Sequence, residues 1–321
     1  ICHCLVGSEM CIRDRQNSSV HSLTHTLHYG VGVFEGVRAY KGDQGTAIFR
    51  LQDHTDRLFK AAEIVNIKIP YSKEELNKIQ CEILHQNRLQ EAYLRPIIYL
   101  GDESMGLRAE DLSVNVIIAA WEWPSYMDPQ SKVKGISMVK SSFPQYKNPL
   151  WSNHKITGTY VNSVVALQDA VSKGADEALM FDDEGFVSEG TGENIFFFKD
   201  NILRTPSIRA CHNGITRQSI ISIAKDFGYK VEEGDWTYND LIESDEIFLT
   251  GTAVEVTPVT KIDNEIITYT GKRRNLTNIA INSGAIDAKY DTIISGITTT
   301  NISVGDIVSL SSVKIANYGD N

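Results

Sequence analysis

Long apolar runs are absent from this sequence of 321 residues. A helix that crosses a bilayer needs about 20 predominantly apolar residues, and runs such as Val116–Trp121 are far shorter. Positive charge is also scarce, because 31 Lys and Arg stand against 41 Asp and Glu, which gives a net charge of −10. We therefore expect no membrane association and no nucleic acid partner. An anionic small molecule is still compatible with this charge, since local basic residues decide its binding.

A disulfide framework is missing as well. Three of the five cysteines lie within the first eleven residues, and Cys81 and Cys211 stand alone. The Cys2-His3-Cys4 stretch looks like part of a metal-ligand cluster, but it lacks a second pair of ligands at the spacing of a zinc site. We expect no bound metal and a cytoplasmic location, where thiols stay reduced.

Strands and helices alternate along the middle of the chain, which predicts a two-domain α/β plan. The apolar content of 42% and the charged content of 22% are those of a globular protein. We expect a small N-terminal α/β domain over residues 17–124 and a larger domain over 135–270. The linker is expected over 125–134, because prolines and turn formers interrupt both periodicities near its start.

The two ends differ from the middle in amino-acid composition and hydrophobic periodicity. Residues 1–16 have no clear periodicity and resemble translated sequencing-adaptor sequence, so we treat them as a non-native scar. Residues 271–321 contain 17 Ser, Thr or Asn among 51 residues and no Glu, Phe, Trp or Pro. Their alternating runs predict short strands. This segment is either an atypical extension or a foreign segment joined near residue 271.

Hydrophobic periodicity and end signals predict the individual elements. Strands are expected at 46–50, 93–100, 114–121, 135–140, 177–182, 195–199 and 245–249. Helices are expected from Asp53 as N-cap to about Val65, from the Ser72 cap to Arg88, from about Thr159 to Ser172, and from Gly214 onward with Ile220, Ile223, Ala224 and Phe227 facing inward.

The most informative stretch contains one lysine, one tyrosine and two acids. Lys155 and Tyr160 belong to a loop that leads into a helix, and Glu189-Gly190-Thr191-Gly192-Glu193 follows 34 residues after the lysine. Such residues can hold pyridoxal phosphate: a lysine amine forms a Schiff base with its aldehyde, and a carboxylate keeps its pyridine nitrogen protonated. The tyrosine hydroxyl could donate to the phenolic oxygen. The competing interpretation is a solvated lysine and an exposed acidic loop.

A phosphate group needs its own binding residues. Gly214-Ile215-Thr216 opens a helix, and the amides at a helix N-terminus bind anions. The Gly251–Ala253 loop is a second candidate, and Arg57 could supply counter-charge. Each of these features is also common in purely structural roles.

Arg95 stands inside the apolar run Tyr93–Tyr99. A buried arginine requires an anionic partner, either an acid of the protein or a bound carboxylate. Residues 28–40 add aromatic residues, glycines and a possible ion pair, although they also fit a glycine-rich loop with core aromatics.

In combination, these motifs closely resemble the branched-chain amino acid aminotransferases, a class IV family of fold type IV pyridoxal phosphate enzymes. The resemblance covers residues 20–268 and rests on seven stretches: His28-Tyr29-Gly30, Phe34 to Arg38, Arg95-Pro96, Lys155 to Tyr160, Glu189 to Asn194, Gly214 to Arg217, and Gly251-Thr252-Ala253. It implies two α/β domains with the cofactor between them. It also implies transfer of the amino group between L-Leu, L-Ile or L-Val and 2-oxoglutarate in a ping-pong cycle.

The resemblance also implies roles for single residues. Lys155 is expected to bind the cofactor and move the proton. The expected cofactor ligands are Glu189 at the pyridine nitrogen, Glu193 beside it, Tyr160 at the phenolic oxygen, and Arg57, Ile215, Thr216 and Thr252 at the phosphate. The expected substrate residues are Tyr29, Phe34 and Tyr126 around the side chain, Gly36 and Arg38 near them, Thr252 and Ala253 at the α-carboxylate, and Arg95 at the distal carboxylate of glutamate. Family members are homodimers in which a loop, here residues 104–107, closes the neighbour's site.

Two kinds of alternative stay open. Within the same fold, the chain could be a D-amino acid or (R)-amine transaminase or a 4-amino-4-deoxychorismate lyase. Outside it, the unusual ends raise the hypothesis of an inactive chimeric chain with the tail of a structural protein.

Overall fold

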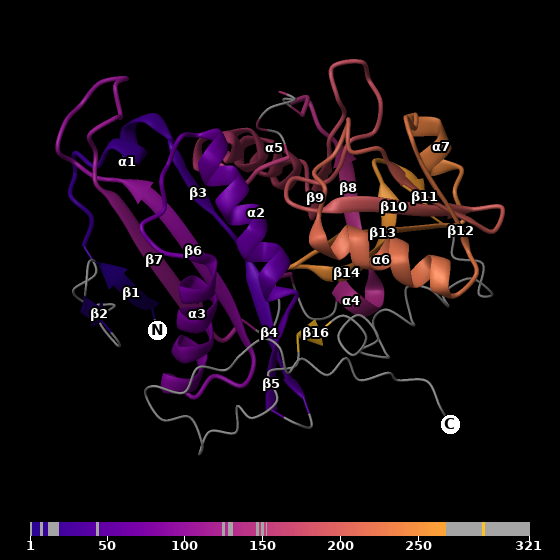
Figure 1. Cartoon of the computed structure of the whole chain (residues 1–321). Coiled ribbons are helices and arrows are strands. Elements are labelled where there is room, and N and C mark those ends of the chain that lie inside the picture. The colour runs from indigo at the N-terminus through magenta and orange to yellow at the C-terminus, as the bar shows by residue number, and fades with distance from the viewer. Residues whose placement is uncertain are drawn as a thin grey trace. The chain divides into compact units, whose positions relative to one another are not determined.

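The computed structural model describes residues 2–6, 9–11, 19–42, 45–123, 126–127, 131–145, 148, 151, 153–267 and 291–292. Backbone contacts divide the chain into two units (Figure 1). Unit 1 comprises Ile1–Pro124, His154–Gly158 and Asp287–Asn321, and unit 2 comprises Ser125–Asn153 and Thr159–Ile286. Lys155 therefore belongs to unit 1, although the chain on both sides of its short segment belongs to unit 2.

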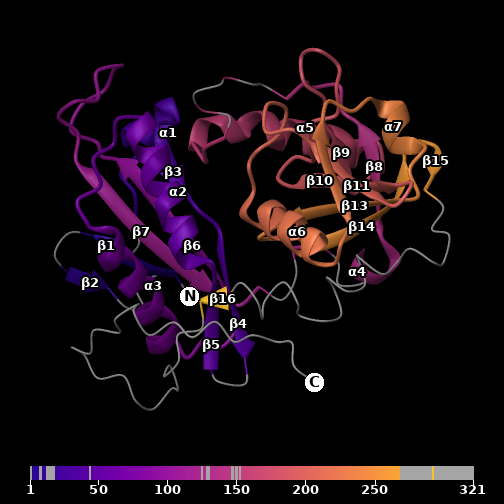
Figure 2. The same ribbon diagram turned by 45° about the vertical axis from the view of Figure 1, so that its right-hand side comes forward.

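Unit 1 is built on one antiparallel sheet with the strand order β16-β5-β4-β6-β7-β1-β2, and β3 also pairs with β6. The strands are β1 (Cys2–Val6), β2 (Glu9–Cys11), β3 (Gly32–Phe34), β4 (Val37–Gly42), β5 (Gly45–Phe49), β6 (Ala92–Leu100), β7 (Val114–Trp121) and β16 (Asp291–Thr292). The helices are α1 (His25–Tyr29), α2 (Leu51–Ile64) and α3 (Lys73–Gln86). Helices α2 and α3 lie side by side over the sheet (Figures 1 and 2).

The core of unit 1 lies between these two helices and the sheet. Leu58 on α2 and Leu76 on α3 are each 1% exposed, and they belong to one apolar cluster with Leu94 and Ile98 of β6. The apolar stripe of each helix covers the central strands, which places the end of β3 and the start of α2 close to the same core.

Unit 2 contains a mixed sheet with the order β12-β11-β10-β13-β14-β8-β9, and β15 pairs with β14. The strands are β8 (Ile136–Lys140), β9 (Glu177–Leu179), β10 (Asn194–Lys199), β11 (Ile202–Pro206), β12 (Lys230–Gly234), β13 (Glu246–Gly251), β14 (Glu255–Ile262) and β15 (Glu265–Ile266). The helices are α4 (Ser131–Lys134), α5 (Tyr160–Ser172), α6 (Ile215–Asp226) and α7 (Tyr238–Ile242), with a 3-10 turn over Thr157–Thr159 before α5.

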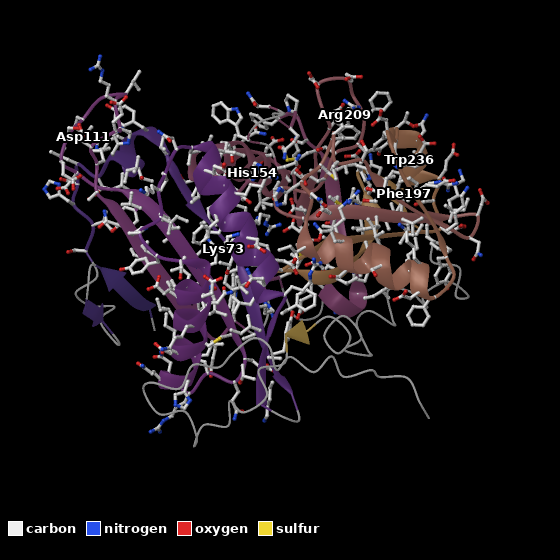
Figure 3. The ribbon with its side chains drawn as sticks, in the orientation of Figure 1. Lys73, Asp111, His154, Phe197, Arg209 and Trp236 are labelled. Atoms are coloured by element: carbon white, nitrogen blue, oxygen red, sulfur yellow. The ribbon has the colours of Figure 1, made fainter. Side chains whose placement is uncertain are left out.

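Aromatic residues fix the centre of the unit 2 sheet. Phe196 and Phe248 are cross-strand partners whose rings stack with centroids 5.3 Å apart. On the opposite face of β10, Phe197 meets the edge of Trp236 at 5.4 Å (Figure 3). This packing holds β10 and β13 rigidly, and both strands carry candidate site residues at their ends.

The predicted elements are found within a few residues of their expected bounds, with two corrections at the level of single residues. Ser72 caps α3 and forms a capping box with Glu75, as expected. Asp53 is not the N-cap of α2: Arg50 is, in a left-handed conformation (φ 46°), and its Nε donates to Asp53 in the first turn. Phe227 does not face inward and is 56% exposed, because α6 ends at Asp226 and Phe227 is its C-cap.

The two ends of the chain lie mostly outside the described residues. The strands predicted within residues 271–321 lie outside them as well; in that segment only β16 is described, and it pairs with β5. Near the other end, β1 pairs with β7 and β2 pairs with β1. Within the described part of the chain, no helix has the length and apolar character needed to cross a membrane.

Core packing in unit 1 can be tested with a matched pair of leucines. Leu94 is fully buried in β6, whereas Leu27 on α1 is 65% exposed. We expect Leu94→Ala to lower the free energy of unfolding by about 2–5 kcal/mol, because it removes buried methyl groups and leaves a cavity. Leu27→Ala should change it by less than about 0.5 kcal/mol. Denaturant titration at fixed protein concentration checks both values, and equal effects would contradict the described core.

Candidate active site

Backbone hydrogen bonds attach Lys155 to unit 1. The amide of Phe34 donates to the carbonyl of Lys155 (3.1 Å), and Ile156 forms an isolated bridge with Val33. The Lys155 side chain is half-buried, and its Nζ lies 5.7 Å from the centroid of the Phe34 ring. The edge of β3 thus fixes the position of the lysine and places an aromatic ring beside its amine.

Two glycines make this attachment possible. Gly158 donates from its amide to the carbonyl of Gly30 (2.9 Å), and Gly30 has a left-handed backbone with φ at 69°. A Cβ atom on Gly30 would lie only 2.8 Å from the Cα of Gly158. The close approach requires glycine, which gives a physical reason for the glycines near the lysine.

A buried ion pair orients Arg57. Its Nε and Nη2 donate to the two carboxylate oxygens of Glu35 at 2.6 and 2.8 Å, and His54 Nδ1 lies 2.9 Å from the same carboxylate. Burial acts to raise the pKa of Glu35, but the charge and hydrogen bonds of Arg57, together with His54, hold it well below its ordinary value. Glu35 is therefore ionised and anchors Arg57, which is 13% exposed.

Two histidines of unit 1 have lowered pKa values near this pair. Burial lowers the pKa of His54, the hydrogen bond and charge of Glu35 oppose this shift, and the charges of Arg57 and Lys155 add to it. Burial also lowers the pKa of His154, with further contributions from Lys60 and Arg57. Both shifts favour neutral imidazoles.

Arg95 is packed between aromatic rings. Its guanidinium carbon lies 4.8 Å from the ring centroid of Phe34 and 5.4 Å from that of Tyr93, and Nη2 donates to the Tyr93 hydroxyl (3.1 Å). Within the described chain, the buried Nε of Arg95 has no hydrogen-bond partner. A Cβ atom on Gly36 would lie 1.9 Å from the Tyr93 hydroxyl, so glycine is required here.

Two other expected substrate residues belong to unit 1. Tyr29 is 38% exposed, and its hydroxyl accepts from the amide of Gly106 (3.1 Å), which ties it to the loop over residues 104–107. Arg38 is 7% exposed and lies opposite Tyr93 in the pairing of β4 with β6. The structure thus brings together Phe34, Gly36 and Arg95 around Tyr93, with Arg38 as its cross-strand neighbour.

In unit 2, three donors hold the carboxylate of Glu189. Gln145 Nε2 donates to Oε1 at 2.7 Å, while the amide of His212 (2.9 Å) and Asn194 Nδ2 (3.3 Å) donate to Oε2. Glu189 is 6% exposed. These three hydrogen bonds fix the orientation of the Glu189 carboxyl group.

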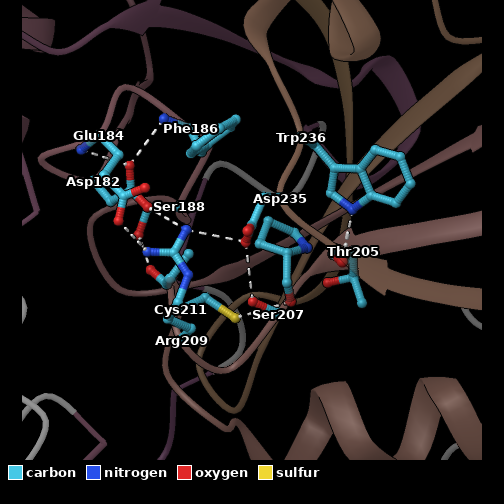
Figure 4. Close-up of polar contacts among 12 residues, drawn as sticks. Asp182, Glu184, Phe186, Ser188, Thr205, Ser207, Arg209, Cys211, Asp235 and Trp236 are labelled. Carbon is cyan, nitrogen blue, oxygen red and sulfur yellow. Dashed lines mark hydrogen bonds and ion pairs between the residues drawn. The ribbon is translucent and has the colours of Figure 1, made fainter.

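A polar network connects the segment that precedes Glu189 to the segment that precedes His212 (Figure 4). Arg209 forms ion pairs with Asp182 (3.3 Å), Glu184 (3.0 Å) and Asp235 (3.1 Å). Ser188, directly before Glu189, donates to the carbonyl of Ala210. These contacts fix the loop that contains His212, whose amide donates to Glu189.

The N-terminus of α6 lies next to this loop. Gly214 is its N-cap and supplies no side-chain hydrogen bond, and a Cβ there would lie 2.2 Å from Asn194 Oδ1. Ile215 and Thr216, the first residues of the helix, are buried. The first amides of such a helix lack intrahelical partners and form an anion-binding end.

The Gly251–Ala253 turn continues from β13 beside the Glu189–Asn194 turn, since Thr250 pairs with Asn194 and the Gly251 backbone approaches Glu193. Thr252 and Ala253 are half-buried there. Tyr160 is the first residue of α5. On the same helix, Asn162 Nδ2 donates to Gln145 Oε1 (3.4 Å), and Gln145 in turn donates to Glu189. Tyr126 also belongs to unit 2 and is 41% exposed.

Sequence reasoning missed several residues that the structure places in these networks. Gln145 carries no local signal, because its link to Glu189 spans 44 positions. His54 carries no local signal either. The sequence indicates Glu35 only as one member of a possible ion pair. Among the described residues, no group of three or more His, Cys, Asp or Glu could hold a metal ion.

Comparison with known proteins places this geometry in a family. The amino-transferase class IV family model matches residues 32–262. The branched-chain-amino-acid aminotransferase of Pseudomonas aeruginosa is 51% identical over 253 residues, which are 78% of this chain and 82% of that protein. A solved T.th. branched-chain amino acid aminotransferase with pyridoxamine 5'-phosphate superposes with a TM-score of 0.80 at 38% identity, covering 85% of this chain and 90% of that one.

The same T.th. protein has been solved with N-(5'-phosphopyridoxyl)-L-glutamate and with 4-methylvaleric acid, each at a TM-score of 0.78, 38% identity and the same coverage. The predicted α/β fold of type IV is confirmed by these likenesses. The chain belongs to the amino-transferase class IV family and is a pyridoxal phosphate-dependent aminotransferase, as its sequence predicts.

Proposed function

We propose that this protein transfers the amino group between L-leucine, L-isoleucine or L-valine and 2-oxoglutarate. The observation that carries the proposal is Arg95, a half-buried cation whose guanidinium lies over two aromatic rings. The aromatic rings suit a branched apolar side chain, and the guanidinium suits the distal carboxylate of glutamate. The identity of 51% to a branched-chain enzyme favours this activity over that of a D-amino acid transaminase or a lyase of the same fold.

The residues present fit pyridoxal phosphate. Unit 1 supplies a half-buried lysine and the guanidinium of Arg57, which Glu35 fixes. Unit 2 supplies the buried carboxyl group of Glu189, which Gln145 and the His212 amide orient, and the first amides of α6. When bound, the cofactor supplies an aldehyde for the amino group and a ring that takes up electrons from the substrate's α-carbon.

Each group has a role that follows from its surroundings. Lys155 would hold the cofactor covalently and would move the proton of the substrate's α-carbon. Glu189 would accept the N–H of the pyridine ring, because Gln145 and the His212 amide already orient its two oxygens. Tyr160 would donate to the phenolic oxygen.

Each unit, taken by itself, offers groups that suit a phosphate. In unit 1 the candidate is Arg57, whose guanidinium Glu35 holds in place. Ile215 and Thr216 offer the first amides of α6, and Thr252 adds its hydroxyl. Thr252 and Ala253 also bind the α-carboxylate of the substrate through their amides.

We further propose a cytoplasmic homodimer. The loop over residues 104–107 exposes Leu107 at 89% and Met105 at 44%, and its Gly106 binds Tyr29. Exposed apolar side chains next to a substrate residue favour coverage by a second copy of the chain.

Removing the lysine tests the cofactor assignment. We expect Lys155→Ala to abolish the visible absorption of the bound cofactor and to lower the turnover rate by at least about 10²- to 10⁴-fold, because proton transfer is lost. Lys41→Ala is the control, since Lys41 is an exposed lysine on β4. Visible spectra after reconstitution decide, and a band that persists without Lys155 would exclude it as the cofactor lysine.

Arg95 can be tested with the two half-reactions. We expect Arg95→Leu to lower kcat/KM for 2-oxoglutarate by about 10- to 150-fold, because a hydrogen bond to a charged group contributes about 1.5–3 kcal/mol. The half-reaction with L-leucine should change by less than about threefold, since leucine has no distal carboxylate. Stopped-flow single turnovers measure both, and equal losses for the two substrates would contradict the assigned role.

Glu35→Gln tests the anchor of Arg57. The folded pKa of Glu35 lies below its ordinary value of 4.5, so its contribution to stability is present above pH 4.5 and is lost as the pH falls through the folded pKa. We expect the substitution to cost about 3–5 kcal/mol at pH 7, because Arg57 and His54 lose a buried partner. The difference from the wild type should shrink below pH 4.5.

The measurement for this prediction is the free energy of unfolding as a function of pH. Glu63→Gln serves as the control, because Glu63 is exposed on the same helix as Arg57. A difference between wild type and Glu35→Gln that stays constant with pH would show that the charge of Glu35 is not what matters.

A further inference from the structure

Two buried carboxyl side chains lie together behind the Glu189–Asn194 turn. Glu177 begins β9 and is 0% exposed, and Glu193 is 5% exposed. The two carboxyl groups are within hydrogen-bonding reach of each other. No Lys, Arg or His of the described chain forms an ion pair with either, so their charges are not balanced by a cation.

The turn is folded around these two groups. Glu177 Oε1 accepts from the amides of Ala178 (2.7 Å) and Thr191 (3.1 Å), and Glu193 Oε2 accepts from the amide of Gly192 (3.0 Å). The amide of Gly190 donates to the Glu193 carbonyl at 2.8 Å. Three consecutive amides of the turn therefore point to Glu177 or Glu193.

One oxygen of the pair lacks a donor. Glu177 Oε2 is buried and, among the described residues, has no hydrogen-bond partner. A buried acceptor that has no donor destabilises the fold, because it has lost its hydrogen bonds to water. The group placed to supply the missing donor is the Glu193 carboxyl, and it can do so only if it carries a proton.

Electrostatics favours that protonation. Burial raises the pKa of Glu193 well above its ordinary value, and the charges of Glu177 and Glu189 raise it further. Two carboxylates that share a buried site cannot both ionise at neutral pH without a large cost in free energy. A single retained proton removes the repulsion and satisfies Glu177 Oε2 at the same time.

We propose that Glu177 and Glu193 share one proton at neutral pH, carried by Glu193 and donated to Glu177 Oε2, and that Glu193 is a positioning residue for Glu189. Glu193 is then not a direct ligand of the cofactor, in contrast to the role expected from the sequence. The O–H of Glu193 closes the turn that orients Glu189. The positioning role rests on the proposed function, whereas the shared proton does not depend on it.

The proton can be observed directly by infrared spectroscopy at pH 7. A protonated carboxylic acid has a C=O stretch that is separate from the carboxylate bands and shifts in D₂O. We expect this band in the wild type, with and without cofactor, and its loss in Glu193→Gln, because Glu177 is then ionised with an amide donor beside it. Glu265→Gln, which changes an exposed acid on β15 of the same unit, should keep the band. Absence of the band in the wild type, or its persistence in Glu193→Gln, would overturn the proposal.

The positioning role needs a second pair of variants. Glu193→Gln retains a neutral donor, whereas Glu193→Leu has a similar size and none. We expect cofactor affinity, measured by equilibrium titration, to fall at least about tenfold further in Glu193→Leu than in Glu193→Gln. Equal affinities of the two variants would show that the donated hydrogen bond does not position Glu189. If both variants and the wild type fail to bind cofactor while the infrared band is present, the proposed function is wrong and the shared proton stands.

Discussion

The hydrogen bond from the Phe34 amide to the Lys155 carbonyl determines where the chemistry of unit 1 can occur. Residues 154–158 are the only five between residues 125 and 286 that belong to this unit, so a very short segment must bind tightly to place the lysine. The bridge of Ile156 with Val33 and the contact of Gly158 with Gly30 provide that attachment. Because β3 itself pairs with β6, the lysine backbone is tied to the strand that carries Arg95.

The site residues show three solutions to one problem, which is the cost of a buried acid. Glu35 is balanced by the full charge of Arg57 and stays ionised. Glu189 accepts hydrogen bonds from Gln145, Asn194 and the His212 amide, and in our proposal it is the acceptor for the ring nitrogen of the cofactor. Glu193 is neutralised by a proton in our proposal. Each solution suits a different role, since the first acid fixes a cation, the second attracts one, and the third shapes a turn without adding charge.

Most of the fold could be predicted from local sequence, and so could the candidate cofactor residues as a proposal, but the residues that support them could not. Some elements have sequence patterns that lie within a few neighbouring positions and could be interpreted directly. They are the Ser72 cap, strand β7 and the start of α6. The N-cap of α2 was mistaken because a left-handed Arg50 is set by the preceding strand rather than by its own preference. Gln145 and His54 could not be assigned, since each acts through a partner 44 or 19 positions away that only the tertiary fold brings near.

In our proposal, Arg95 allows one site to accept both an apolar and an acidic side chain. A guanidinium exposed to water would be costly to cover with leucine, because its hydration would be lost without compensation. Stacking on Phe34 and Tyr93 and the hydrogen bond to the Tyr93 hydroxyl provide that compensation before any substrate binds. We therefore expect that burying an apolar side chain beside Arg95 costs little free energy, while the charge of the guanidinium still attracts a carboxylate. Because a side chain on Gly36 would displace Tyr93, this glycine protects the dual specificity although it contributes no functional group.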